Sequence, residues 1–245
     1  LDEASLAVAI EHLAAIESPL ARAIVWGAAW DATRDAETPA RDYVRLVLNN
    51  IATETESTTI RTTLMQLAAV ARTYVDPATR AATIEEVADS LWQLAQGAEA
   101  GSDAQFQFVQ YFANLAATPA HGEVLAGLRD GSITLPGLEI DTDLDWLLLE
   151  GLALVGAATG DDIDAALAKD NTSNGQQAAA RARAALPDAA SKRATFDRLV
   201  GDDSVPNAIV RMTCLGWPHA HDPSAFEKLV EPYFASLTGI WNDRS

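Results

Sequence analysis

The residues best suited to hold a metal ion are the histidines and aspartate of the segment His219-Ala-His221-Asp222. Two imidazoles two residues apart could meet one metal ion only from extended backbone. A proline stands on each side of the segment, so a loop with surface histidines is the favoured interpretation. A metal-binding regulator that uses His219, His221 and Asp222 stays open as an alternative.

A second segment with metal-binding residue types is Asp141–Asp145, in which aspartates alternate as at the start of a calcium loop. Trp146 stands where that loop needs a glycine for its sharp turn, and Leu152 stands where it needs a closing glutamate. Acidic residues at the start of a helix interact favourably with its free amides and its dipole. We therefore predict helix starts without calcium, both here and at Gly160–Asp164.

Motifs for catalysis are absent from the sequence. The zinc-peptidase motif H-E-x-x-H is not found at His12 or His121, and there is no glycine-rich phosphate loop and no G-x-S-x-G elbow. Glu85 and Glu86 are adjacent on an expected helix, so they point apart and cannot act as a pair. The single cysteine, Cys214, lies in an apolar helical context and is predicted to pack as a small hydrophobic residue. We predict no catalytic, cofactor-binding or metal-binding residue in this chain.

The most distinctive pattern is a row of arginines and tryptophans on one expected helix, preceded by the cap Ser18 and by Pro19. Residues four apart share a helix face. The Arg/Trp row consists of Arg22, Trp26, Trp30 and Arg34. Cation–π contacts could form at each end, and two indoles are costly to leave in water, so we expect the row to pack against a partner surface. We expect at least one of the two tryptophans to be fully buried.

Two further clusters are aromatic. The first lies on one short helix and is predicted to pack in the core or, alternatively, to line a groove: Phe106, Phe108, Tyr111 and Phe112. The second is predicted to seal the last pair of helices: Tyr233, Phe234 and Trp241.

The elements that position these residues are predicted to be helices, because apolar residues recur at spacings of three and four and alanine is abundant. Five capping residues followed by proline mark helix starts. The expected helices are Glu3–Ile16, Pro19–Ala36, Pro39–Asn50, Thr58–Tyr74, Pro77–Gln96, Asp103–Ala117, Gly122–Arg129, Asp143–Val155, Asp162–Lys169, Gly175–Ala185, Asp188–Val200, Pro206–Leu215 and Pro223–Trp241. Short loops indicate an all-α, irregular HEAT- or armadillo-like α-solenoid of about 12–13 stacked antiparallel helices. The segment Ser132–Ile140 is expected to be a turn-bearing linker between two sets of helices.

Composition restricts the class of partner. The formal charge of −18 argues against nucleic acid and against an anionic membrane surface. A lone cysteine, together with the absence of a signal peptide and of a long apolar run, favours the cytoplasm. The sequence begins at Leu1 without a methionine, so we expect a fragment of a longer protein.

Several segments together resemble the C-terminal helical domain of aminopeptidase N, in particular the actinobacterial-type zinc aminopeptidases of the gluzincin class. The resemblance lies in Ser18–Asn50, which contains the Arg/Trp row, and in Ile140–Leu149, Asp161–Gly175, Ala179–Pro187, Leu229–Ala235 and Ile240–Ser245. Each segment is a modest helix-surface pattern, and their common order makes the match specific. It is weakest over residues 52–131.

The resemblance implies that residues 1–245 form a single C-terminal helical domain of a longer aminopeptidase that removes N-terminal amino acids from peptides. In this family the zinc is held by H-E-x-x-H and a downstream glutamate, and a G-x-M-E-N loop binds the substrate amine. Neither motif occurs here, so no catalytic residue carries over. The implied domain caps the active site, shapes the peptide channel and has the catalytic domain and peptide substrates as partners. The resemblance also makes the Arg/Trp row a candidate for contacts with the catalytic domain or the channel, and packing among the neighbouring helices is the alternative. These candidate residues are Arg22, Trp26, Trp30 and Arg34. The alternative is a free-standing helical-repeat scaffold that binds other proteins.

Overall fold

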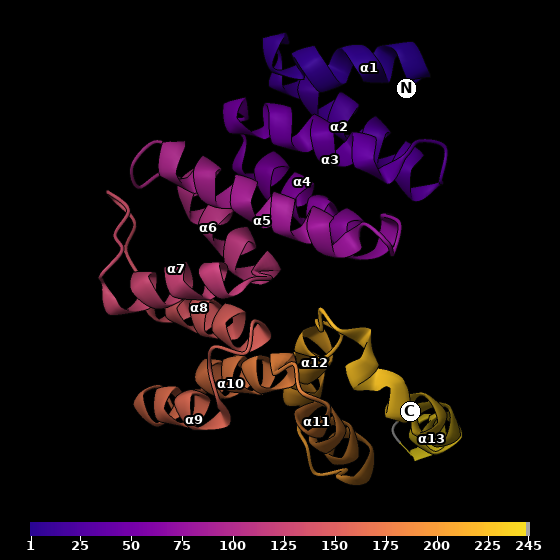
Figure 1. The fold of residues 1–245 in the computed structure, drawn as a ribbon, viewed down its shortest axis with the longest axis vertical. Coiled ribbons are helices and arrows are strands. Elements are labelled where there is room, and N and C mark those ends of the chain that lie inside the picture. Colours follow the sequence, from indigo (N-terminus) through magenta and orange to yellow (C-terminus); the bar gives the residue numbers. More distant parts are fainter. Residues whose placement is uncertain (244–245) are drawn as a thin grey trace. The chain divides into compact units, whose positions relative to one another are not determined.

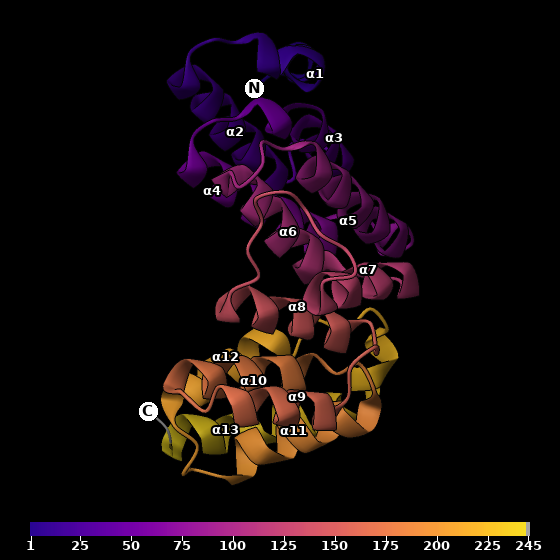
Figure 2. The same ribbon diagram turned by 90° about the vertical axis from the view of Figure 1, so that its left-hand side faces the viewer.

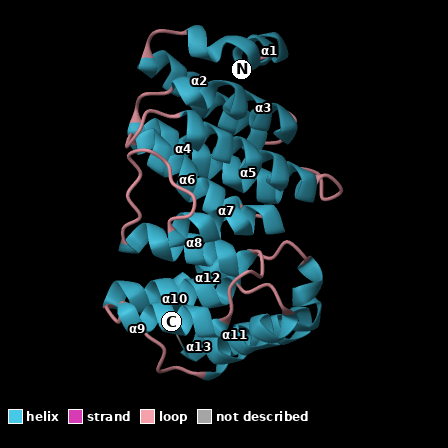
Figure 3. Ribbon diagram, turned by 60° about the vertical axis from the view of Figure 1, so that its left-hand side comes forward, coloured by secondary structure: helices cyan, strands magenta, loops and turns pink. Residues whose placement is uncertain are grey.

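A computed structural model describes residues 1–243 of the chain, and all regular structure in that range is helical (Figures 1 and 3). The α-helices are α1 (Glu3–His12), α2 (Pro19–Arg34), α3 (Ala40–Asn50), α4 (Ser57–Ala69), α5 (Arg80–Gly97), α6 (Asp103–Leu115), α7 (Pro119–Asp130), α8 (Thr142–Leu154), α9 (Gly160–Lys169), α10 (Ser173–Ala185), α11 (Ala189–Gly201), α12 (Asn207–Gly216) and α13 (Val230–Asp243). The all-α prediction is confirmed. The last two residues of the C-terminal segment of the family resemblance, Arg244 and Ser245, lie outside the described range.

Capping residues explain where several helices begin. The Ser18 hydroxyl accepts a hydrogen bond from the Ala21 amide, and Pro19 occupies the first helical position of α2. At α9, Thr159 and Asp162 form a reciprocal capping box. In each case the side chain satisfies an amide that the first helical turn leaves without a partner.

Several expected helices differ in detail from the structure. The first and the fourth end in a 3₁₀ and a π segment, and the seventh begins at Pro119 instead of Gly122. The fifth and the last also differ. The fifth begins at Arg80 instead of Pro77, because residues 77–79 form a turn. The last one is divided: Pro223–Leu229 is a 3₁₀ segment, and α13 begins only at Val230. Asp222 caps the 3₁₀ segment, so this capping residue and proline mark a helical start of the tighter kind.

The chain divides into two compact units, which are described separately. Unit 1 comprises Leu1–Leu115 and Thr134–Glu139 and contains α1 to α6, which follow one another in sequence order (Figure 2). In it α1 packs on α3, α4 packs on α6, and α5 pairs with α6. Its fully buried side chains include Tyr43, Leu64 and Phe112. Packing between helices close in sequence is the arrangement expected within a helical repeat.

The linker between α7 and α8 is partly integrated into unit 1. Residues 134–139 belong to this unit, so the division of the chain falls after Leu115 instead of within the expected linker. Gly137 has a φ of 77°, and a Cβ there would lie 2.4 Å from the Gly101 amide nitrogen. Only glycine permits this approach of two backbone segments.

Unit 2 comprises Ala116–Ile133 and Ile140–Ser245, and its described part contains α7 to α13 (Figure 1). Helix α10 packs on both α8 and α12. The approach to α12 is close: a Cβ on Gly216 would lie 2.3 Å from the carbonyl oxygen of Arg181. The single-domain prediction and a solenoid that runs through the whole chain stay predictions, because they concern both units together.

Two predictions about unit 2 are wrong. Cys214 is exposed on α12 instead of packed, because the buried residues of that helix are Thr213 and Gly216. Tyr233, Phe234 and Trp241 do not seal a helix pair, since 44%, 65% and 77% of their surfaces are exposed. The hydrophobic spacing of α13 correctly predicts a helix, but no other helix in the described part of the chain covers the apolar face that this spacing defines.

Every helix within residues 1–243 is too short or too polar to span a lipid bilayer.

Candidate functional site

The Arg/Trp row divides into a buried and an exposed half. Arg22 and Trp26 are only 6% and 3% exposed, so the expectation that at least one tryptophan is fully buried is confirmed by Trp26. Trp30 is half-buried and packs edge-on against Tyr43 and Tyr74, with ring centroids 6.0 and 5.8 Å apart.

The buried half of the row, Arg22 and Trp26, binds the carboxylate of Glu54. The Nη2 and Nε atoms of Arg22 donate to its two oxygens at 2.8 and 3.1 Å, and the Trp26 indole donates at 3.1 Å. The Thr55 amide donates at 3.0 Å. Arg22 also donates to the Ile16 carbonyl at 2.8 Å. A buried ion pair tolerates its loss of hydration only when such additional hydrogen bonds complete it.

These bonds determine the charge of both partners. Burial by itself raises the pKa of Glu54, but hydrogen bonds from Arg22, Trp26 and Thr55 outweigh it, so the pKa lies below its ordinary value. The hydrogen bond with Glu54 raises the pKa of Arg22. The pair is therefore ionised at neutral pH.

The exposed end of the row has a different partner. Arg34 pairs with Asp31 at 3.3 Å and Asp35 at 3.2 Å, and its side chain is 50% exposed. Both arginines of the row thus form ion pairs with carboxylates, whereas the sequence suggested cation–π contacts with the indole rings.

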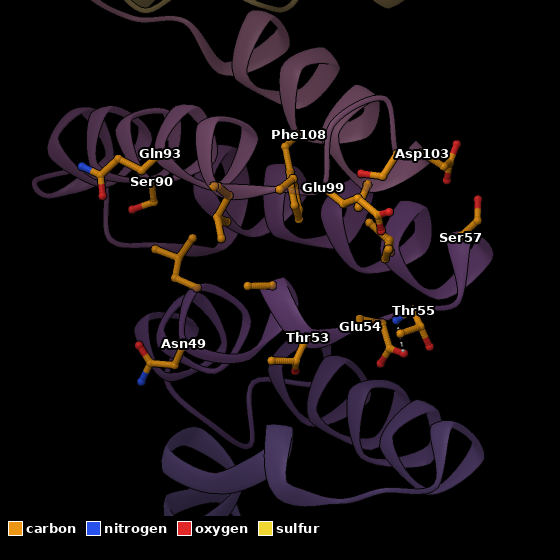
Figure 4. A pocket seen from close by; sticks show the side chains of 18 of the residues that line it. Asn49, Thr53, Glu54, Thr55, Ser57, Ser90, Gln93, Glu99, Asp103 and Phe108 are labelled. Atoms are coloured by element: carbon orange, nitrogen blue, oxygen red, sulfur yellow. Dashed lines mark hydrogen bonds between the residues drawn. The ribbon is translucent and has the colours of Figure 1, made fainter. Parts of the chain in front are cut away.

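Glu54 lines a groove of about 800 Å³ in unit 1 (Figure 4). The groove lies between the segment that follows α3, the start of α4, the end of α5 and the start of α6. Its apolar lining includes Leu48, Ile60, Leu94 and Phe108. The Arg/Trp row does not line the groove itself, but Arg22 and Trp26 hold one of its carboxylates in place.

The charged side chains that line the groove are all acidic. They are Glu54, Glu86, Glu99 and Asp103, and no lysine or arginine joins them among the lining residues of the described chain. Glu86 is paired with Arg41 at 2.7 Å. Glu99 has no side-chain partner among residues 1–243, and Asp103 accepts a hydrogen bond from Gln107 but has no cationic partner there. Net negative charge therefore concentrates at the Glu99–Asp103 end, which Figure 4 shows beside Ser57.

Comparison with known proteins gives two matches that cover the whole chain. Residues 1–245 match the family described as ERAP1-like C-terminal domain. The chain belongs to this family. An aminopeptidase N from Streptomyces lividans is 37% identical over 245 residues, which is all of this chain but only 29% of that enzyme. The resemblance to the C-terminal part of aminopeptidase N, as predicted from the sequence, is confirmed.

The aromatic cluster of this ERAP1-like C-terminal domain serves both roles considered from the sequence. Phe108 and Phe112 are buried in unit 1, and Phe112 packs against Trp92 with ring centroids 5.4 Å apart. Phe108 also lines the groove. Phe106 and Tyr111 are only partly buried.

The acidic segments of the domain act as helix caps and ion-pair partners. Asp141 accepts a hydrogen bond from the Leu144 amide at 2.8 Å at the start of α8, as predicted. Asp145 forms a two-point ion pair with Arg129 at 2.7 and 2.9 Å. These contacts account for both aspartates without calcium.

The side chains of the histidine segment contact different partners and do not converge on one point. The Nε2 atom of His221 lies 2.8 Å from the Ala116 carbonyl, whereas Asp222 accepts hydrogen bonds from Ser224. Within residues 1–243, no three histidine, cysteine, aspartate or glutamate side chains gather in a way that could hold a metal ion. The metal-binding alternative therefore gains no support from the described part of the chain.

Sequence reasoning missed the groove and the role of Glu54. The signal available was a glutamate within the seven connecting residues Ile51–Ser57 between two expected helices, which does not differ from an ordinary surface loop. Its significance depends on a partner 32 residues away in the sequence.

Proposed function

We propose that this chain is the C-terminal helical domain of a cytoplasmic zinc aminopeptidase that removes N-terminal amino acids from peptides. In this proposal the domain caps the active site, shapes the peptide channel and controls access, with no catalysis of its own. The match to aminopeptidase N over the whole chain is the observation that carries it. The partners would be the catalytic domain of the same polypeptide and the peptide substrates.

In this proposal the ligands of the zinc ion belong to the catalytic domain and not to the residues described here. The chain lacks H-E-x-x-H, and its described residues do not gather into a metal site. The contribution of this domain would be to bind and orient peptide. The role of the Arg/Trp row in contacts with the catalytic domain or channel also stays a proposal, and Arg34 and Trp30 have the exposed surface that such contacts need.

The groove of unit 1 is the surface best suited to hold an extended peptide. Its neutral polar side chains, among them Asn49 and Gln93, could pair with peptide backbone, and its apolar lining could accept side chains. The carboxylates would attract a peptide amino group or a basic side chain over ~8–10 Å at ordinary salt.

The first test addresses catalysis. The purified chain should not hydrolyse aminoacyl-coumarin substrates when zinc is supplied, because it lacks the residues that would bind the zinc and the substrate amine. Fluorescence of the released coumarin measures this. Turnover that a chelator abolishes would overturn the proposed inertness.

The second test addresses the groove. Glu99→Gln combined with Asp103→Asn should weaken binding of a labelled peptide with one lysine by roughly three- to tenfold at low salt, because two unneutralised carboxylates are lost. Fluorescence anisotropy measures the affinity, and a peptide with norleucine in place of lysine should respond less. The matched control is Glu37→Gln with Glu123→Gln, which removes equal charge from exposed positions outside the groove. An equal effect of both double variants would contradict a peptide site at this end of the groove.

The alternative is a free-standing helical-repeat scaffold. The gene sequence upstream of Leu1 distinguishes this alternative from the aminopeptidase. An open reading frame that extends several hundred residues before Leu1 and encodes H-E-x-x-H supports the aminopeptidase. A start codon at Leu1 supports the scaffold.

A further inference from the structure

Helix α13 presents a continuous apolar face to solvent. Five large hydrophobic side chains on this helix are exposed by 39–77%: Val230, Tyr233, Phe234, Leu237 and Trp241. At ~100° per residue they fall within an arc of about 100°, which is the width of a stripe that normally faces a protein core. We call these five residues the α13 stripe.

The segment that precedes α13 is packed into unit 2. The helix packs mainly on the segment Pro223–Leu229 that precedes it. In that segment Leu229 is 3% exposed, and the Phe226 ring meets Trp217 with centroids 5.0 Å apart and lies 5.4 Å from the Lys192 Nζ. The chain is thus held in unit 2 up to Leu229, and the α13 stripe that follows is left uncovered in the described part of the chain.

We propose that the α13 stripe is a docking surface for the catalytic portion of the same aminopeptidase polypeptide. The inference rests on the proposed function and adds the place of contact. Tyrosine, tryptophan and phenylalanine are enriched at the centres of protein interfaces, and an amphipathic helix commonly binds by placing its apolar face in a groove.

The length of the relative supports this occupant over others. The matched segment is only 29% of aminopeptidase N, so most of that enzyme lies outside it and could cover the stripe. Residues 230–243 contain no lysine or arginine, which disfavours an anionic membrane surface. A second copy of this chain would bring together two surfaces that each belong to a protein with a net charge of −18.

The test uses hydrogen exchange on α13 in the longer polypeptide and in this chain alone. We expect the amides of residues 230–243 to exchange roughly tenfold or more slowly in the longer polypeptide, because docking suppresses local opening. Leu237→Glu in the longer polypeptide should remove that protection. The matched control, Ala235→Glu, introduces the same charge on the opposite side of α13 at another exposed position and should retain it.

The outcomes separate this inference from the proposed function. If α13 exchanges equally fast in both proteins, or if both glutamate variants behave alike, the docking surface is wrong even when the longer polypeptide is an active aminopeptidase. Protected α13 in a polypeptide without peptidase activity retains the docking surface and overturns the function. Slow exchange in this chain alone, with a dimer in light scattering, would assign the stripe to a second copy and overturn the proposal.

Discussion

Arg22→Met should lower the free energy of unfolding of this protein by about 3–5 kcal/mol, which is the typical cost of removing one partner of a buried ion pair. The Glu54 carboxylate, whose side chain is 1% exposed, would keep its indole and amide donors but lose its counter-ion. Arg22 would also no longer donate to the Ile16 carbonyl. Urea denaturation followed by tryptophan fluorescence measures the loss.

The matched control is Arg34→Met in the same row of the same helix. Arg34 is half exposed and its ion pairs are on the surface, so the expected change is within about 1 kcal/mol.

The pH dependence of the stability gives a second criterion for the buried pair. The pKa of Glu54 lies below its ordinary value in the folded protein, so its stabilising effect is present above the unfolded pKa and is lost as the pH falls through the folded pKa.

In the Arg22→Met variant this dependence should reverse, because an unpaired buried carboxylate becomes easier to protonate. The deficit relative to the wild type should then be largest near neutral pH and should shrink in acid. Equal stability of both arginine variants at pH 7 would show that the buried pair does not determine the stability of unit 1.

Lys192 should make the stability of the protein rise between about pH 8 and pH 10.5. Its side chain is fully buried, and its Nζ donates to the carbonyls of Ala184 at 2.6 Å and Trp217 at 2.9 Å. Burial lowers the pKa of Lys192 to about 8. A neutral amine still has two N–H groups, which match the two carbonyl acceptors.

The sign follows from proton binding. Between the two pKa values the unfolded chain holds a proton on Lys192 that the folded protein does not, so stability increases with pH in this window. The increase amounts to about 3 kcal/mol for a difference of 2.5 pKa units. Urea denaturation at several pH values should show this rise in the wild type relative to Lys192→Met. Parallel pH profiles for the two proteins would contradict a lowered pKa.

The variant comparison is essential because other groups titrate in the same range. Burial raises the pKa of Tyr43, so this residue stabilises the protein below its unfolded pKa and the effect is lost at higher pH. Its contribution is common to the wild type and Lys192→Met and cancels in the difference.

Local sequence patterns were sufficient for the helices and for the family. Capping residues, prolines and the three- and four-residue spacing of apolar side chains placed α2, α8 and α9 to within two residues of their observed bounds. These features act within a few residues of each other, so they can be read without tertiary structure. The same is true of the aspartates at the starts of α8 and α9, whose partners lie three residues away.

Burial and partnership across the fold could not be read in this way. The Arg/Trp row identified an unusual helix face, but only the tertiary structure shows that Arg22 and Trp26 hold Glu54 while Arg34 remains at the surface. A stripe of aromatic residues indicates that a helix has an apolar face, and it does not say whether this protein supplies the residues that cover it. For this reason α6 and α13 have similar patterns, yet Phe112 is fully buried whereas Trp241 is exposed. The sequence by itself determined the helices and the family, because both depend on local order along the chain; the groove, the buried ion pair and the uncovered stripe depend on which distant segments meet in space.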